Sequence, residues 1–251
     1  MAGERPAGDG RIIDPSAFES AFAPGPAPRI QTAAFVTRVE QALSETGQAN
    51  LVGYSRTVLP PGSSVVLTPG GLQISFAPGA TPSPGLRTLV RWSYQGTDKI
   101  SAFTAAGRLA FGERSTTSGG GPTGAVIYGN ATWWRAVSTG TQAPVPQTCG
   151  KGVDLGAGGW PAFIRFELSC GAYLGHSRER VDGVDALRLT GNRGLVALWV
   201  DPRTYLPVRA VFDLGQHSVQ TAFRWLPPTS ASLAHLSLQV PPGFRQIRPP
   251  A

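Results

Sequence analysis

The chain has 251 residues, of which 41% are hydrophobic, and its net charge is +7. No apolar run approaches the roughly 18–20 residues that a membrane-spanning helix needs, so the composition excludes such helices. Its 32 glycines and 23 prolines, spread among many short β-rich runs, predict a turn-rich domain dominated by strands.

The positive charge comes almost entirely from arginine, because Lys99 and Lys151 are the only lysines. Nucleic-acid-binding proteins usually cluster basic residues on one face or helix, whereas these arginines are spread singly, and we predict no nucleic-acid partner. We interpret the excess of arginine mainly as the compositional bias of a GC-rich genome. The alternative is attraction of the protein to an anionic membrane surface. The arginines are Arg56, Arg87, Arg91, Arg108, Arg135, Arg165, Arg188, Arg209 and Arg224.

Residues 1–28 are rich in Pro, Gly and Ala, which predicts a flexible linker with one short helical turn over 14–22. The opening residues lack the apolar core of an export signal, so we expect an export or anchor segment to be absent from this chain.

The first regular element is a helix expected over 30–46, because its apolar residues fall on one face and Gly47 suits the position after a helix end. Strands are expected to follow at 50–59, 63–68 and 72–76.

The run from Leu86 to Gln95 alternates, which predicts a strand with two distinct faces. One face holds Leu86, Thr88, Val90, Trp92 and Tyr94, and the other holds Arg87, Arg91 and Gln95. Further strands are expected at 98–104, 107–113, 124–129 and 132–138.

The two cysteines, Cys149 and Cys170, each lie beside glycine in a polar setting. This setting favours a disulfide over two buried free thiols, and a disulfide implies an oxidising, extracytoplasmic compartment. A second helix is expected over 160–171, with Pro161 in its first turn. The disulfide would tie the long loop at 139–159 to that helix.

The last third predicts an antiparallel meander, because runs of strand length are separated by Gly, Asn or Asp-Pro. These runs are 181–190, 195–202, 203–212 and 223–228. Thr229 is expected to cap a short helical turn over 230–236.

The expected order is one helix, about six strands, a second helix, about four strands and a short turn. A single sheet of this length must curl or split. We predict one α+β domain over 29–248, in which a highly curved antiparallel β-sheet, a half-barrel, is covered by two main α-helices.

Several short motifs accompany this order. Residues 198–202 and 204–209 form a strand, an Asp-Pro turn and a Leu-Pro segment with a basic residue, and 181–186 form a Gly-containing strand entry. Together with the helix at 30–46 and the strand at 52–56, they resemble the lipoprotein-carrier fold (LolA/LppX/RseB-type). That fold is shared by outer-membrane lipoprotein carriers, mycobacterial lipoproteins and the N-terminal domain of periplasmic sigma-factor regulators.

The closing segments at 225–229 and 240–244 also resemble small exported actinobacterial proteins of unassigned activity. In the lipoprotein-carrier fold the sheet and helices enclose an apolar cavity. The resemblance therefore implies binding of a lipid or acyl chain, or sensing of a lipidated partner.

The chain lacks motifs for catalysis or metal binding. Its histidines, His176, His217 and His235, lie on separate expected elements without an acidic partner, so we predict no metal site and no cofactor. Asp182 and Asp185 flank a glycine, which indicates a solvated turn rather than a carboxylate pair for glycoside hydrolysis. No Gly-x-Ser-x-Gly elbow is present, and we predict that the protein is not an enzyme, with a hydrolase as the least favoured hypothesis.

Aromatic residues are the remaining indication of function, although ordinary core packing is the simplest interpretation of each one. The residues considered are Trp92, Tyr94, Trp133, Trp134, Trp160, Trp199 and Trp225. The alternative is that some line a cavity for acyl chains, because the rings are large, rigid and apolar. Trp133 and Trp134 are adjacent, so one faces the core and the other is a candidate contact for a membrane or partner. The predicted cavity-lining residues are Trp92, Tyr94, Trp133, Trp199, Trp225, Phe163 and Ile164.

We therefore expect a non-enzymatic, extracytoplasmic protein of the cell envelope that binds a lipid or acylated lipoprotein and makes peripheral membrane contact. The alternative is an envelope sensor or interaction module, displayed on the 1–28 linker, that regulates a membrane signalling partner.

Overall fold

The computed structural model describes residues 32–46, 50–60, 63–68, 71–75, 85–117, 122–129, 131–136, 149, 159–191, 194–213 and 218–248. The predicted linker at 1–28 and its helical turn lie outside the described residues.

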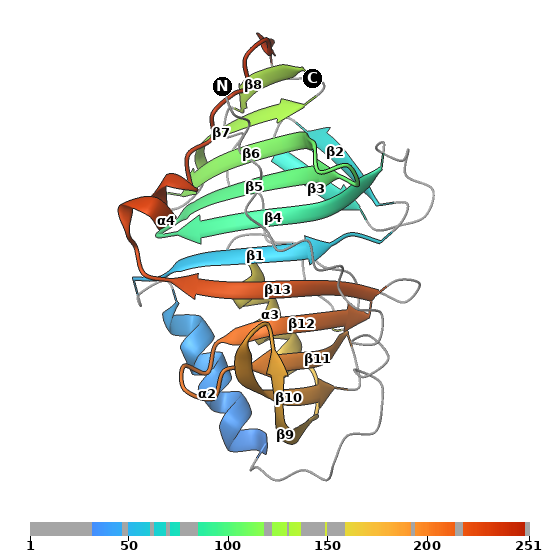
Figure 1. Ribbon diagram of the computed structural model, residues 1–251, viewed down its shortest axis with the longest axis vertical. Coiled ribbons are helices and arrows are strands. Elements are labelled where there is room, and N and C mark those ends of the chain that lie inside the picture. Colours follow the sequence, from blue (N-terminus) through green and yellow to red (C-terminus); the bar gives the residue numbers. More distant parts are fainter. Residues whose placement is uncertain are drawn as a thin grey trace.

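Among the described residues, twelve strands form one sheet and two form a separate hairpin (Figure 1). The strands are β1 (Val52–Val58), β2 (Ser64–Thr68), β3 (Gly71–Ser75), β4 (Leu86–Tyr94), β5 (Thr97–Thr104), β6 (Leu109–Thr117), β7 (Pro122–Gly129), β8 (Thr132–Ala136), β9 (Tyr173–Val181), β10 (Val184–Gly191), β11 (Leu195–Val200), β12 (Pro207–Asp213), β13 (Ser218–Leu226) and β14 (Arg245–Gln246). The order across the large sheet is β14-β8-β7-β6-β5-β4-β1-β13-β12-β11-β10-β9, and β2 pairs with β3. Every neighbouring pair is antiparallel except β14 with β8.

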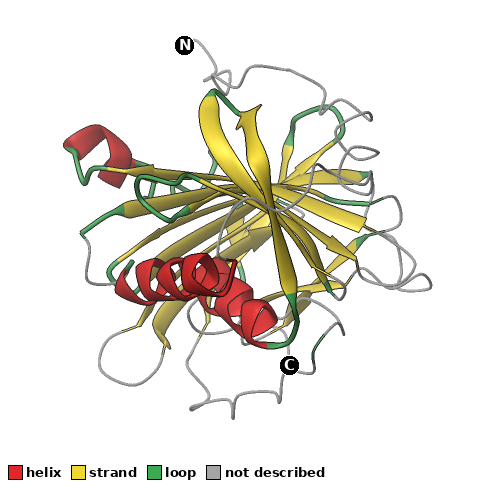
Figure 2. Cartoon of the chain, turned by 90° about the horizontal axis from the view of Figure 1, so that it is seen from below, coloured by secondary structure: helices red, strands yellow, loops and turns green. Residues whose placement is uncertain are grey.

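Two longer helices lie together on one side of the sheet, and a short third helix lies on the other side (Figure 2). The helices are α2 (Thr32–Glu45), α3 (Gly159–Ser169) and α4 (Ser230–Ala234). We call the side facing α2 and α3 the inner face and the opposite side the outer face. The α+β class, the curved antiparallel sheet and the two main helices are confirmed. The two helices contact each other and β9 and β11, so they cover the β9–β13 half of the sheet.

The core beneath α2 and α3 is packed with interlocking aromatic rings. Trp160 of α3 stacks on Phe212 of β12 with ring centroids 5.1 Å apart, and its edge meets Phe223 of β13 at 5.9 Å. Phe163 lies 5.2 Å from the Phe212 ring. Offset and edge-to-face contacts of this kind add about 1 kcal/mol each to the burial of the rings. The amphipathic pattern of both helices thus finds its apolar partner on the inner face.

A second core lies on the outer face at the far end of the sheet, where the β9–β10 hairpin curls over its neighbours. Asp182 at the hairpin tip accepts hydrogen bonds of 2.6 and 3.1 Å from Arg209 on β12, and a register shift between Leu187 and Leu189 bends β10. The curl encloses the buried side chains Ala186, Ala197, Trp199, Val208 and Val211.

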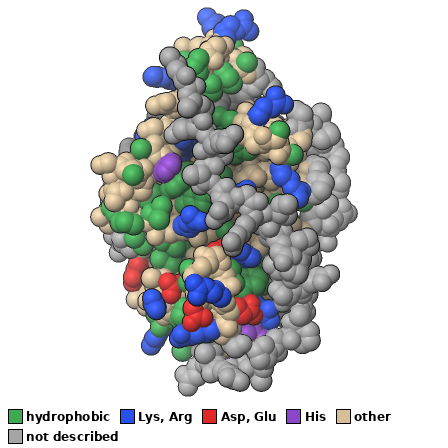
Figure 3. Space-filling model, viewed as in Figure 1, with side chains coloured by type: hydrophobic (Ala, Val, Ile, Leu, Met, Phe, Trp, Pro, Cys, Tyr) green, Lys and Arg blue, Asp and Glu red, His purple; other side chains and the backbone are tan. Residues whose placement is uncertain are grey.

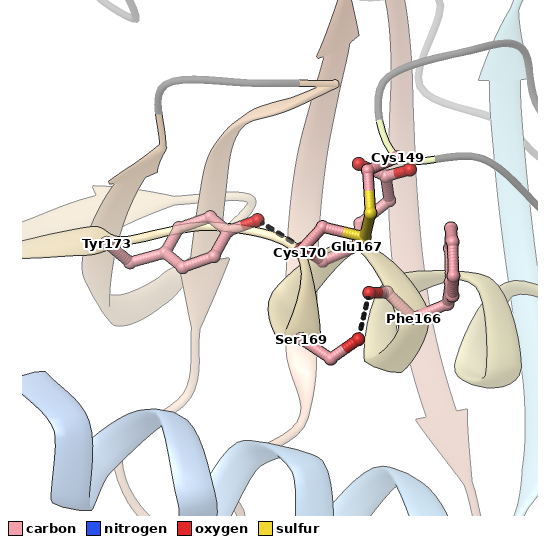
Figure 4. The surroundings of a disulfide bond; sticks show 6 residues. All are labelled: Cys149, Phe166, Glu167, Ser169, Cys170 and Tyr173. Atoms are coloured by element: carbon pink, nitrogen blue, oxygen red, sulfur yellow. Dashed lines mark hydrogen bonds between the residues drawn. A yellow bond between two sulfur atoms is a disulfide. The ribbon is translucent and has the colours of Figure 1, made fainter.

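The predicted disulfide is present and joins Cys149 to Cys170, with Cα atoms 5.7 Å apart (Figure 4). Cys170 follows the last residue of α3. Tyr173, the first residue of β9, donates a 2.7 Å hydrogen bond to the Glu167 backbone carbonyl. The disulfide and this hydrogen bond together fix the end of α3 beside the start of β9.

Several strand boundaries differ from the expectations. No strand is expected over 172–180, where most of β9 lies, β12 begins at Pro207 rather than at 203, and β13 begins at Ser218 rather than at 223. The helical turn near 230 is confirmed, because the Thr229 side chain accepts from the Ser232 amide in a capping box.

Candidate functional site

The inner face of β4–β8 lies beyond the two covering helices and presents one continuous row of residues. The register places Phe223, Ser55, Arg91, Ile100, Glu113, Ile127 and Trp134 opposite one another on successive strands from β13 to β8. Neighbouring strands lie about 4.8 Å apart, so Arg91 and Trp134 stand roughly 19 Å from each other. The row therefore spans the half of the sheet that α2 and α3 leave uncovered.

Apolar side chains fill the inner face beside this row. A separate buried cluster consists of Leu59, Leu86, Leu89, Ala102 and Phe111, with Ile100 and Ala110 packed against it. The β2–β3 hairpin lies behind this half of the sheet (Figure 1), and β3 contacts β7. The candidate site is thus the inner face of β4–β8, where an apolar cluster lies beside the buried polar residues Arg91 and Glu113.

Two buried tryptophans, one on β8 and one in the helix-covered core next to Gly159, have unpaired indole N–H groups among the described residues. Trp134 on β8 is 2% exposed and Trp160 at the start of α3 is 3% exposed, and neither indole N–H has a hydrogen-bond partner within the described part of the chain. A buried donor without a partner costs about 1–3 kcal/mol, and most buried polar groups in proteins are paired. Both belong to the aromatic set noted in the sequence, but alternation alone gives no sign of a missing acceptor.

A buried ion pair lies at the α3 end of the surface. The Arg91 guanidinium donates to both carboxylate oxygens of Asp98, at 3.0 and 2.8 Å, and the Arg91 side chain is buried. It lies against Gly159, the first residue of α3, which has a φ of +56°. The ion pair places a buried polar group beside the apolar side chains of the inner face.

Three of the predicted lining residues belong to the packed inner core. Phe163 and Ile164 of α3 are buried there, and Trp225 of β13 packs against the same cluster. The Trp225 indole donates a 2.8 Å hydrogen bond to the Pro207 carbonyl, so its polar atom is satisfied within the protein.

The other four predicted lining residues lie on the outer face. Trp92 stacks on His235, which follows α4, at 4.1 Å, and Tyr94 donates to Asn50. Trp133 is half-buried, whereas its neighbour Trp134 is the buried member of the pair. Trp199 lies in the second core and donates to Glu179 at 2.9 Å. The structure therefore does not bring the seven predicted residues together.

The described part of the chain has neither a metal-binding cluster nor a long apolar helix. No group of three or more His, Cys, Asp or Glu side chains within it is arranged to hold a metal ion. None of its helices has both the length and the apolar character needed to cross a membrane.

No family model matches this chain, and no curated protein matches its sequence. Similar solved structures include LprF from Mycobacterium bovis, with 11% identity over 87% of this chain and 99% of that chain and a TM-score of 0.39. The LolA superfamily protein NE2245 from Nitrosomonas europaea has 13% identity over 82% and 97%, with a TM-score of 0.25. MucB in the Pseudomonas aeruginosa MucA/MucB complex has 12% identity over 81% and 61%, with a TM-score of 0.34. They are proteins of the kind that the sequence motifs resemble, and at these TM-scores no property is transferred from them.

Proposed function

We propose that this protein is a non-enzymatic lipid-binding protein that holds the acyl chain of a lipid or lipoprotein against the inner face of β4–β8. The observation that carries the proposal is the pair of buried indole N–H groups, on Trp134 and Trp160, that lack an acceptor. An ester or amide carbonyl of a bound amphiphile would accept from such a donor and remove its desolvation cost.

The rest of the surface has the chemistry that an amphiphile requires. Binding sites for small apolar molecules are lined mainly by hydrophobic residues with a few placed polar groups. Here the buried cluster around Leu89 and Phe111 is apolar. Arg91 and Trp134 supply polar groups on the same face of the sheet, and Trp160 directly follows Gly159, which lies against Arg91. This arrangement of apolar and polar groups favours a ligand with a long apolar chain and a polar group at one or both of its termini.

The disulfide supports an extracytoplasmic location for this activity. The Cys149–Cys170 bond is formed, and disulfides persist mainly in oxidising compartments such as the periplasm and the cell exterior. A protein that binds acyl chains there would meet lipids and lipidated proteins of the envelope.

The test is to purify the protein from its own host, extract it with organic solvent and identify the released lipids by mass spectrometry. The affinity for a fluorescent fatty acid is then measured for the wild type, Trp134→Phe and Trp160→Phe, with Trp92→Phe on the outer face as the matched control. Removing one hydrogen bond is expected to weaken binding about 2–10-fold in the two inner variants, whereas the control should bind like the wild type.

Absence of both extracted lipid and fatty-acid binding would contradict this proposal. That result would favour the envelope sensor or interaction module, which would then be sought by crosslinking the protein to membrane proteins of the host. Equal losses in the inner variants and in Trp92→Phe would place the ligand elsewhere.

A further inference from the structure

The outer face of the same half-sheet carries a row of cations and aromatic rings. One position along from the inner row, the register aligns Arg224, Tyr54, Trp92, Lys99, Arg114, Val126 and Arg135 on β13, β1 and β4–β8. Arg56 lies two residues further along β1 on the same face. Arginines that are isolated in the sequence are therefore gathered by strand pairing onto one surface.

The described strands of this surface carry no carboxylate on the outer side. The seven strands concerned contain two carboxylates, Asp98 and Glu113, and the register places both on the inner face, opposite Ser93 and Ile100. Figure 3 looks onto the outer face, and the Asp and Glu side chains visible there lie in its lower part, over the β9–β13 half. The charged side chains that these strands place on the outer face are thus arginines and a lysine.

The positive charges of this row affect the pKa of Tyr54. Burial raises the pKa of Tyr54, and the positive charges of Arg56 and Arg224 lower it in part. Arg135 and Arg224 are exposed at the two ends of the row, where they are accessible to a partner.

A pocket of about 430 Å³ lies within this surface, between α4 and strands β5 and β6. Arg114 enters it beside leucines and donates a 3.0 Å hydrogen bond from its Nε to the Leu236 carbonyl. The lining residues are Thr97, Arg114, Leu233, Leu236, Ser237 and Leu238. A cation beside apolar side chains matches a phospholipid, which joins a phosphate to acyl chains, better than it matches a nucleic acid or an acidic protein.

We infer that the outer face of β13, β1 and β4–β8 is a docking surface for a bilayer containing anionic phospholipids. Basic residues near such a bilayer each contribute about 1 kcal/mol, and tryptophans such as the half-buried Trp133 of this face are favoured at a membrane interface. The inference deepens the proposed function, because a protein that carries an acyl chain on its inner face must approach a membrane with another surface. The two faces can then be occupied at the same time.

The experiment measures sedimentation of the full chain with vesicles of phosphatidylglycerol and phosphatidylcholine, compared with vesicles of phosphatidylcholine alone. The test variant is the triple substitution Arg56→Ala, Arg135→Ala and Arg224→Ala. The control variant is Arg165→Ala, Arg180→Ala and Arg203→Ala, which removes the same charge from exposed arginines on the helix-covered half. The test variant is expected to partition roughly a hundredfold more weakly onto anionic vesicles, and the control to change by less than about threefold. Wild-type binding should fall steeply as salt is added.

Equal binding to neutral vesicles, or equal loss in the two triple variants, would overturn the inference. Stronger binding of the wild type to heparin or duplex DNA than to anionic vesicles would overturn it in favour of a polyanion. Fatty-acid binding by the test variant separates the two proposals. If it stays at the wild-type level while vesicle binding is lost, both stand, and if vesicles bind without any fatty-acid binding, only the proposed function fails.

Discussion

The guanidinium group of Arg91 occupies the space that a side chain at Gly159 would need. A Cβ atom at position 159 would lie 2.5–2.7 Å from the guanidinium carbon and both terminal nitrogens. Gly159 also begins α3 with a positive φ of 56°. The start of the helix and the buried arginine of β4 are therefore fitted to each other, and either one limits what the other position tolerates.

Gly159→Ala is expected to destabilise the fold by about 2 kcal/mol or more, because alanine is disfavoured at positive φ and would displace Arg91. Gly85→Ala is the matched control, since Gly85 has a φ of +61° with open space around it. The free energies of unfolding, measured in urea, should differ by the cost of the displacement. Equal values for the two variants would show that Arg91 moves aside freely.

Asp98→Asn is expected to lower the free energy of unfolding by about 2 kcal/mol, because it leaves the buried charge of Arg91 without its carboxylate. The estimate is below that for a fully buried pair, since a quarter of the Asp98 side chain is exposed. The control is Asp185→Asn, because both Asp185 and its partner Arg178 are about 60% exposed. Such a surface pair contributes about 0–1 kcal/mol. Chemical denaturation measures both, and a larger loss in the control would contradict this explanation.

Tyr173 is expected to make stability fall in alkaline solution. Burial raises the pKa of its hydroxyl, and the carboxylates of Glu167 and Glu40 raise it further. The unfolded chain therefore loses this proton first, from about pH 10, so the contribution is present below about pH 10 and declines above it.

The variant that tests this is Tyr173→Phe. Loss of the hydrogen bond to the Glu167 carbonyl should lower its free energy of unfolding by about 1 kcal/mol at pH 7. Because phenylalanine has no proton to lose, the gap to the wild type should narrow between about pH 9 and about pH 11.5. Urea denaturation across this range is the measurement, and a constant or widening gap would refute the assignment.

Removal of the disulfide by the double substitution Cys149→Ser and Cys170→Ser is expected to cost about 3 kcal/mol. The two cysteines are 21 residues apart, and a loop of this size restricts the unfolded chain by about that amount. Reduction of the wild-type protein should lower the denaturation midpoint to the same value. A loss below about 1 kcal/mol would show that the unfolded chain already holds this segment near the end of α3.

The periodic elements could be predicted from sequence, whereas β9 could not. The expected helices at 30–46 and 160–171 match α2 and α3 closely because both have an apolar stripe and a clear end signal. By contrast, β9 includes His176, Arg178, Glu179 and Arg180 in a strand of nine residues. A strand at the edge of a sheet that is this polar gives no alternating apolar signal.

Local sequence patterns also could not predict how the residues of the candidate site are arranged. Alternation separates the residues of β4 into two faces, and the structure confirms this from Thr88 to Tyr94, whereas a register shift between Leu86 and Thr88 places Leu86 in the inner cluster. Alternation does not reveal which face is inner, because the inner position beside Trp92 is filled by the charged Arg91, whose burial depends on Asp98 from the next strand. Trp92 is instead covered from outside by His235, which lies 143 residues further along the chain. Such contacts between distant segments lie beyond the reach of local patterns.

The division of charge between the two faces has a consequence for how the strands find their pairing. Glu113 and Arg114 are consecutive on β6, as Asp98 and Lys99 are on β5, and each pair sends its carboxylate inward and its cation outward. A slip of one residue would exchange every side chain between the faces. In a slipped β5 or β6, Lys99 or Arg114 would then face the apolar side chain of Leu89 on the inner face. Mispaired sheets are thereby penalised while the chain is still assembling, and the correct alignment is selected before either face meets a ligand or a membrane.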